Sequence, residues 1–255
     1  GNYTVDLNSP VIGTGEYGFN MGAYGVGCES SNGDFLLFFN GDDNVSLGNI
    51  ESITQSSDLS AYASFYWDGR VVDGTDWITL FGDGDNSCGF YLQIYSDNKI
   101  ELRLGTQSIL TDPVIIPNQW NEILFNTNGF NEHKIFVNGL LILSDNRIID
   151  LCNSDRTVYI SDNGGGTAGK FIGAINSVIF WDTVVDNYTS NNGIAASYNF
   201  TTGYGNILYD QSGNGYNGTI NGAIWVENNL NECCDEDTIG DIDCNSIRDI
   251  ADIII

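Results

Sequence analysis

The stretch GFYLQIYSDNKIELRLG, residues 89–105, decides the fold class. Polar and apolar side chains alternate on both sides of its central SDNK, residues 96–99. Alternation puts every second residue on the same side of an extended strand, so the stretch predicts a β-hairpin with one face in a core. The residues expected to point into that core are Phe90, Leu92, Ile94, Ile100, Leu102 and Leu104.

A second hairpin is predicted at HKIFVNGLLIL, residues 133–143, where Asn138-Gly139 supplies the positive φ angles of a type I′ turn. Further short strands are expected along most of the chain. They cover Phe35–Phe39, Tyr62–Trp67, Trp77–Phe81, Gln119–Phe125, Val158–Ile160, Phe171–Trp181, Ala195–Phe200 and Ala223–Val226. Many short strands joined by glycine-rich turns are typical of a β-sandwich or barrel.

The organisation of the chain is expected to be one main domain and a tail. A chain of 255 residues can bury one substantial core. The composition becomes cysteine-rich and acidic after residue 228, so the sequence predicts a sandwich over 1–228 and a tail over 229–255. Apolar residues at helical spacing predict that the tail ends in a short helix: Ile247, Ile250, Ala251 and Ile254.

The charge balance excludes several kinds of partner. Only 8 Lys and Arg oppose 34 Asp and Glu, which gives a formal net charge of −26. Such a field repels phosphate backbones and anionic lipids, so nucleic acid is not an expected partner. No stretch approaches the roughly 20 apolar residues needed to span a bilayer, so membrane insertion is not expected either. The carboxylates suit Ca²⁺ ligation, or they simply keep a secreted protein soluble.

The cysteines point to an extracellular or cell-surface location. The six cysteines lack the C-x-x-C spacing of zinc sites, so disulfides in an oxidising compartment are expected and their pairing stays open. They are Cys28, Cys88, Cys152, Cys233, Cys234 and Cys244. Glycan acceptor triplets occur at Asn2, Asn44, Asn187, Asn199 and Asn217, about as many as chance would give in an Asn-rich chain.

Several segments, in order between residues 35 and 182, resemble the concanavalin A-like lectin family that includes laminin-G domains. They are FNGDDNVSLGN, SFYWDG, GFYLQIYSDNKIELRLG, QWNEILFN, HKIFVNGLLI, VYISDNGGG and FIGAINSVIFWD. The resemblance implies an all-β fold, a two-sheet antiparallel jelly roll, that binds carbohydrate or protein, often with Ca²⁺ at the rim of a sheet. One sandwich architecture hosts many functions, so the ligand stays open.

Residues 198–227, YNFTTGYGNILYDQSGNGYNGTINGAIWVE, also resemble a segment that accompanies such domains. In the family this segment usually precedes the FNGDDN-like strand, whereas here it follows the core. We expect it to close the sandwich as a permuted edge, which is feasible where the two ends of a domain lie close together.

Three loops of the sandwich could hold calcium, because each offers closely spaced oxygens next to glycine. An ordinary Asn-Gly turn or a solvated loop would explain the same residues. The candidate ligands are Asp210, Ser212 and Asn214 in the first loop, Asp83 and Asp85 in the second, and Asp42 and Asp43 in the third.

The tail contains a fourth calcium candidate with more specific spacing. Its oxygens would come from Asp241, Asp243, Asn245, the Ile247 carbonyl, Asp249 and Asp252. The loop resembles one half of a dockerin module, whose paired loops dock onto a cohesin partner. Ser246 replaces the turn glycine of that motif, and Arg248 replaces an apolar residue.

No catalytic residues are predicted, and the chain is not expected to be an enzyme. Glycosidases need two carboxylates that flank the sugar bond, and the E-x-D-x-x-E strand of related folds is missing. The single histidine, His133, has no nucleophile beside it in the sequence and is expected at a loop or strand edge. Ligand contact is instead expected from an aromatic and acidic surface made by Trp77, Asp83, Asp85, Tyr91 and Tyr95.

Two functions remain open from the sequence. The first is an extracellular, calcium-binding recognition or adhesion module for carbohydrate or a protein partner. The alternative is a structural subunit of a filament, sheath or appendage, in which exposed edge strands join neighbouring copies. The weakly charged strands and the cysteine-rich tail motivate the second function.

Overall fold

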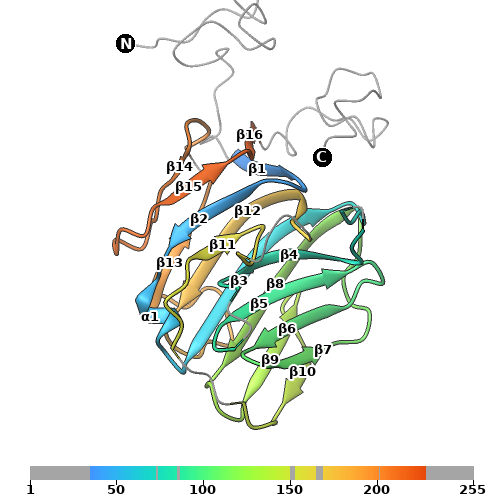
Figure 1. Ribbon diagram of the computed structural model, residues 1–255, viewed down its shortest axis with the longest axis vertical. Helices are drawn as coiled ribbons and strands as arrows, with labels where there is room; N and C mark the ends of the chain where they lie inside the picture. Colours follow the sequence, from blue (N-terminus) through green and yellow to red (C-terminus); the bar gives the residue numbers. More distant parts are fainter. Residues whose placement is uncertain are drawn as a thin grey trace, which may run out of the picture. The chain divides into compact units, whose positions relative to one another are not determined.

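The computed structural model describes residues 35–72, 74–84, 87–149, 153–164, 169–200 and 202–227. These residues form two antiparallel sheets packed face to face, the jelly-roll sandwich that the sequence predicts (Figure 1). The domain boundary at residue 228 and the predicted tail helix lie outside the described residues.

The first sheet runs in the order β10-β9-β8-β3-β12-β1-β16, and β13 also pairs with β12. Its strands are β10 (Leu140–Asp145), β9 (His133–Val137), β8 (Gln119–Thr127), β3 (Leu59–Trp67), β12 (Ile172–Trp181), β1 (Phe35–Asn40), β16 (Ile224–Glu227) and β13 (Ile194–Tyr198).

The second sheet runs in the order β14-β15-β2-β11-β4-β5-β6-β7. Its strands are β14 (Ile207–Leu208), β15 (Gly218–Asn221), β2 (Asn44–Gly48), β11 (Val158–Ile160), β4 (Trp77–Gly82), β5 (Phe90–Tyr95), β6 (Ile100–Leu104) and β7 (Gln107–Leu110). A single helical turn, α1 (Glu51–Thr54), follows β2.

Both predicted hairpins are confirmed. β5 pairs with β6 so that Leu92 lies opposite Leu102, with both side chains buried. In the β9–β10 turn, Asn138 and Gly139 have φ angles of 49° and 75°, as a type I′ turn requires. The strands β2, β7, β14 and β15 and the helical turn α1 are not among the predicted elements.

Aromatic rings fill the space between the sheets. The Phe180 ring meets Phe81 edge to face at 5.5 Å, and Phe81 also stacks on Phe125 at 6.1 Å. Phe171 makes edge contacts with Phe39 and Phe65 further along the core. These rings bury large apolar areas and tie the two sheets into one body.

Residues 198–227 close the sandwich, as predicted. β15 extends the second sheet by pairing with β2, and β16 extends the first sheet by pairing with β1. The Tyr198 hydroxyl donates a hydrogen bond to the Tyr216 carbonyl at 2.6 Å, which joins the start of the segment to its middle. The permuted segment therefore supplies an edge to each sheet.

Candidate functional site

The outward side of β4–β7 carries a cluster of polar and aromatic side chains. Cross-strand pairing places Thr79, Gln93 and Glu101 in one row, and Tyr91, Arg103 and Ser108 in the next. Trp77 and Tyr95 form a third pair beside them. Because the opposite residues of the same strands fill the core, these eight side chains point to the outer side of the sheet. We call them the polar face. Four of them are half-buried, Trp77, Tyr95, Arg103 and Ser108, and the other four are buried beneath their neighbours.

Hydrogen bonds hold the centre of the polar face in one arrangement. The Tyr95 hydroxyl donates to Glu101 Oε2 at 2.8 Å, and the Ser108 hydroxyl donates to Glu101 Oε1. Arg103 Nη1 donates to Ser108 Oγ at 2.9 Å, and Arg103 Nε donates to the Gly105 carbonyl at 3.0 Å. The carboxylate and the guanidinium are thus fixed side by side, so a ligand would meet groups that are already ordered.

The two tyrosines of the polar face stay protonated at neutral pH. Burial raises the pKa of Tyr91, and Arg103 offsets this rise only in part. Burial also raises the pKa of Tyr95, and the hydrogen bond to Glu101 raises it further. Both phenols therefore keep their protons and remain hydrogen-bonding groups without charge.

Trp77 forms the aromatic edge of the polar face. Its half-buried indole lies 6.3 Å from the Tyr95 ring at a tilt of 48°. Gly169 packs behind it with φ of +70°, and a Cβ atom there would lie 2.4 Å from Trp77 Nε1. Only glycine leaves room for this approach, so a larger residue at position 169 would displace the indole.

A buried ion pair adjoins the polar face on the β4 side. Lys170 forms an isolated bridge with Thr79, and its Nζ lies 3.4 Å from Asp162 Oδ2. The ammonium also donates to the Asp42 carbonyl at 3.0 Å. Burial raises the pKa of Asp43 next to this group, although a hydrogen bond from the Asn40 backbone lowers it in part. The fixed Lys170 ammonium beside Asp42 and Asp43 disfavours a divalent cation there, because like charges repel.

Asp210 acts as a backbone anchor. Its Oδ1 accepts hydrogen bonds from the backbone N–H groups of Ser197 and Ser212, at 3.0 and 2.9 Å. Its Oδ2 accepts from the Tyr216 N–H at 3.0 Å and the Ser212 hydroxyl at 2.8 Å. Burial raises the pKa of Asp210, but these hydrogen bonds outweigh it and hold the pKa below its usual value. Asn214 instead donates its amide to the Ala195 carbonyl.

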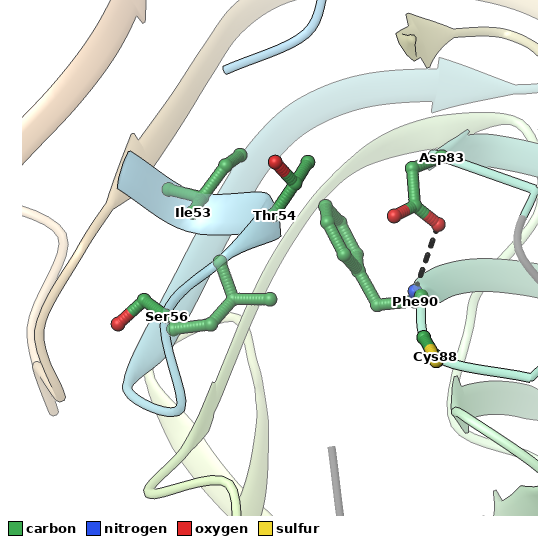
Figure 2. A pocket seen from close by; sticks show the side chains of 8 residues that line it. Ile53, Thr54, Ser56, Asp83, Cys88 and Phe90 are labelled. Carbon is green, nitrogen blue, oxygen red and sulfur yellow. Dashed lines mark hydrogen bonds between the residues drawn. The ribbon is translucent and has the colours of Figure 1, made fainter. Parts of the chain in front are cut away.

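Asp83 lies inside the fold and away from the polar face. Its side chain points at the Phe90 backbone, whose N–H donates to Asp83 Oδ1 at 3.0 Å (Figure 2). The neighbouring cavity, lined by Ile53, Thr54 and Phe90 among others, measures about 10 Å³. That is room for about one water molecule, too little for a ligand. Asp85 lies outside the described residues.

The remaining predicted residues are scattered. Asn187, Asn199 and Asn217 are exposed, whereas Asn44 is half-buried and donates to Asp162. Cys88 takes part in a disulfide bond. The other five cysteines, Asn2 and the calcium candidates from Asp241 to Asp252 lie outside the described residues.

Within the described residues, no group of three His, Cys, Asp or Glu side chains is arranged to hold a metal ion. Calcium binding therefore stays a prediction.

His133 has a structural place at the start of β9. Its ring is buried, with Nε2 3.0 Å from the Arg147 carbonyl and Nδ1 2.7 Å from the Thr127 hydroxyl. Since a carbonyl only accepts, Nε2 carries the proton and Nδ1 accepts from Thr127. Burial lowers the pKa of His133, so the neutral ring is the folded form.

This histidine should make stability fall at mildly acidic pH. The unfolded ring has a pKa of about 6.5, and the folded ring has a lower one. The contribution is therefore complete above about pH 6.5 and shrinks below it, by up to about 1.4 kcal/mol per pH unit. Thermal unfolding at pH 7.5 and 5.5 should show a larger loss for the natural protein than for His133→Gln. Equal losses in the two proteins would contradict this assignment.

Comparison with known proteins identifies the family to which this fold belongs. A family model described as the concanavalin A-like lectin/glucanases superfamily matches residues 39–189. No curated protein matches the sequence significantly. Within the described residues, no helix is long and apolar enough to cross a membrane.

This chain is similar to several solved structures. A Bacteroides ovatus protein, for which carbohydrate binding has been proposed, superposes with a TM-score of 0.62 and 19% identity over 76% of this chain. The chain spans 60% of the length of that protein. A heptameric pentraxin from Limulus polyphemus gives a TM-score of 0.46 and 15% identity, over 64% of this chain and 84% of the pentraxin. The CBM40 domain of a Ruminococcus gnavus sialidase, bound to α2,3-sialyllactose, gives 0.46 and 14%, over 58% and 90%.

Proposed function

This chain belongs to the concanavalin A-like lectin/glucanases superfamily, and from that premise we propose that it is a carbohydrate-binding module whose ligand site is the polar face. One observation carries the proposal. The face combines an ordered carboxylate and guanidinium, Glu101 and Arg103, with an indole edge, Trp77. The Bacteroides ovatus structure has a similar fold and supports carbohydrate binding as the function.

The chemistry of the polar face matches that of a sugar. Sugar hydroxyls both donate and accept hydrogen bonds, so Glu101 would accept from one hydroxyl while Arg103 donates to its neighbour. The apolar side of a pyranose ring would pack on Trp77, which buries area without a polar cost. Because Tyr95 and Ser108 already order Glu101, little side-chain entropy would be lost on binding.

We propose binding without catalysis. A glycosidase needs two carboxyl groups about 5–10 Å apart on either side of the scissile bond. In the described residues, Glu101 is the only carboxylate that strands β4–β7 themselves carry. Its hydrogen bonds from Tyr95 and Ser108 suit a fixed acceptor better than a group that exchanges protons with a substrate.

A glycan array, followed by calorimetric titration of the best oligosaccharide, tests the function. We expect a limited set of related glycans to bind, at affinities that fall when Trp77 is removed. An array without hits, or hits that ignore Trp77, would overturn the assignment of the polar face.

Self-assembly is a second candidate function, and strand β10 is the observation that favours it. This edge strand pairs only with β9 among the described strands, and it exposes Leu140, Leu141 and Ile142. An exposed apolar edge offers unpaired backbone groups to another strand. A chain that binds no glycan and elutes as a concentration-dependent oligomer would favour assembly over carbohydrate recognition.

We also propose that the tail binds calcium and that the protein is extracellular. The Asp241–Asp252 spacing suits a calcium loop, whereas Asp83 and Asp210 already accept hydrogen bonds from backbone N–H groups. Calcium should therefore raise the melting temperature of the full chain, because a ligand of the native state stabilises it. The rise should vanish in the double variant Asp241→Ala, Asp252→Ala and persist in Asp42→Ala. A rise that survives the double variant would place calcium elsewhere.

A further inference from the structure

A second cavity opens on the other side of the sandwich, on the outward face of the first sheet. Its floor follows one cross-strand row, in which Tyr62 lies opposite Leu124 and Leu124 lies opposite Phe136. The volume is about 310 Å³. This value falls at the lower end of the roughly 300–1,000 Å³ typical of small-molecule sites.

The segment 182–193 forms the wall of this cavity and is fixed at both ends. The Ser60 hydroxyl donates to the Thr183 carbonyl at 2.8 Å, and the Asn126 amide donates to the Val185 carbonyl at 2.7 Å. At the far end, Trp181 Nε1 donates to the Ser190 carbonyl at 3.0 Å. The wall is therefore attached to the sheet on either side of the opening.

An aromatic stack fills one end of the row. The Tyr188 ring from this segment lies parallel to Tyr62, with centroids 4.6 Å apart and planes 19° apart. Leu124 and Phe136 continue the apolar row beyond the stack and line the cavity. An apolar ligand group placed there would pack on aliphatic and aromatic surface.

The polar groups at this cavity are acidic. Glu122 and Asp186 line it, and no Lys or Arg is found among the described residues of the lining. Asp186 pairs with Lys134 at 3.3 Å, so part of its charge is neutralised. Glu122 takes part in none of the ion pairs among the described residues, and its Oε1 accepts a hydrogen bond from the Tyr62 hydroxyl at 3.1 Å. A carboxylate beside an apolar floor attracts a cation that carries an apolar body.

We propose that this cavity is a second ligand site, distinct from the polar face, that takes an aromatic amine in its ammonium form. The ammonium lies at Glu122, and the ring lies over Leu124 and Phe136 against Tyr188. The formal net charge of −26 raises the local concentration of such cations and disfavours anions.

The test compares two probes of nearly equal size and shape, phenethylammonium and 2-phenylethanol, titrated into the full chain by ligand-observed NMR. We expect the ammonium to bind at least tenfold more tightly than the alcohol. Glu122→Gln should remove this preference and leave the alcohol unaffected. Raised salt should weaken only the ammonium, since screening acts on charge.

Three further variants separate the site from its surroundings. Tyr188→Ala should weaken both probes, and its exposed position makes the variant safe for folding, which the melting temperature checks. Tyr204→Ala, at a tyrosine that is 76% exposed and outside the cavity, is the matched control and should change neither affinity. Equal affinities of the two probes, or a preference that survives Glu122→Gln, would overturn the proposal. Trp77→Ala should leave both probes unaffected, so this outcome is independent of carbohydrate binding.

Discussion

Trp77→Ala should lower the affinity for the best oligosaccharide by at least tenfold. The indole is half-buried beside the Tyr95 ring, and the absence of a side chain at Gly169 leaves the room that it occupies. Truncating a tryptophan that packs on the ligand typically costs about 2 kcal/mol or more, and about 1.4 kcal/mol corresponds to a factor of ten. Calorimetric titration of the natural chain and the variant measures the difference.

Two companion variants make this result specific. Glu101→Gln keeps the shape of the acceptor but removes its charge, so it should weaken binding less than Glu101→Ala does. Trp225→Ala is the matched control, because this tryptophan packs on Phe200 and donates to the Gly205 carbonyl, away from the polar face. Unchanged affinity in Trp77→Ala, with a normal melting temperature, would contradict the assignment of the polar face.

Asp210→Ala should destabilise the fold by about 2–4 kcal/mol. The carboxylate satisfies three backbone N–H groups, from Ser197, Ser212 and Tyr216, and it joins β13 to the turn that leads into β15. Hydrogen bonds to a charged group contribute about 1.5–3 kcal/mol each, and the total should fall below their sum because Asp210 is only half-buried and water can reach the freed donors. Denaturant unfolding measures the loss.

The same variant distinguishes an anchor from a calcium ligand. If Asp210 acts as an anchor, the loss should be equal in calcium and in a chelator. Asp97→Ala removes an exposed carboxylate whose ion-pair partner among the described residues is Lys99, and it should change stability by less than about 0.5 kcal/mol. A loss at Asp210 that appears only in calcium would restore the metal assignment.

Strand alternation made the sandwich and part of the site predictable. Tyr91 and Tyr95 were expected on the outer surface, because they alternate with core residues along β5. Glu101 and Arg103 have the same parity on β6 and could have been selected by the same reasoning. Ser108 could not be predicted from the sequence. Strand β7 has only four residues, and its register against Arg103 is known only from the three-dimensional structure.

The calcium candidates of the sandwich show what the sequence could not predict. Clustered oxygens in the sequence do not reveal which donors will reach them in the fold. The Ser197 N–H that binds Asp210 and the Lys170 ammonium beside Asp42 come from distant positions in the chain. The cavity at Glu122 could not be predicted either, because its wall comes from a loop without helical or strand periodicity.

The pairing of β1 with β16 bears on how this sandwich can be combined with other polypeptides. Phe35 lies directly opposite Glu227, so the described sandwich begins and ends at neighbouring positions on one edge. A unit with adjacent ends can be inserted into a surface loop of a host protein without stretching either connection. The polar face, on β4–β7 at the other end of the second sheet, would stay accessible in such a fusion.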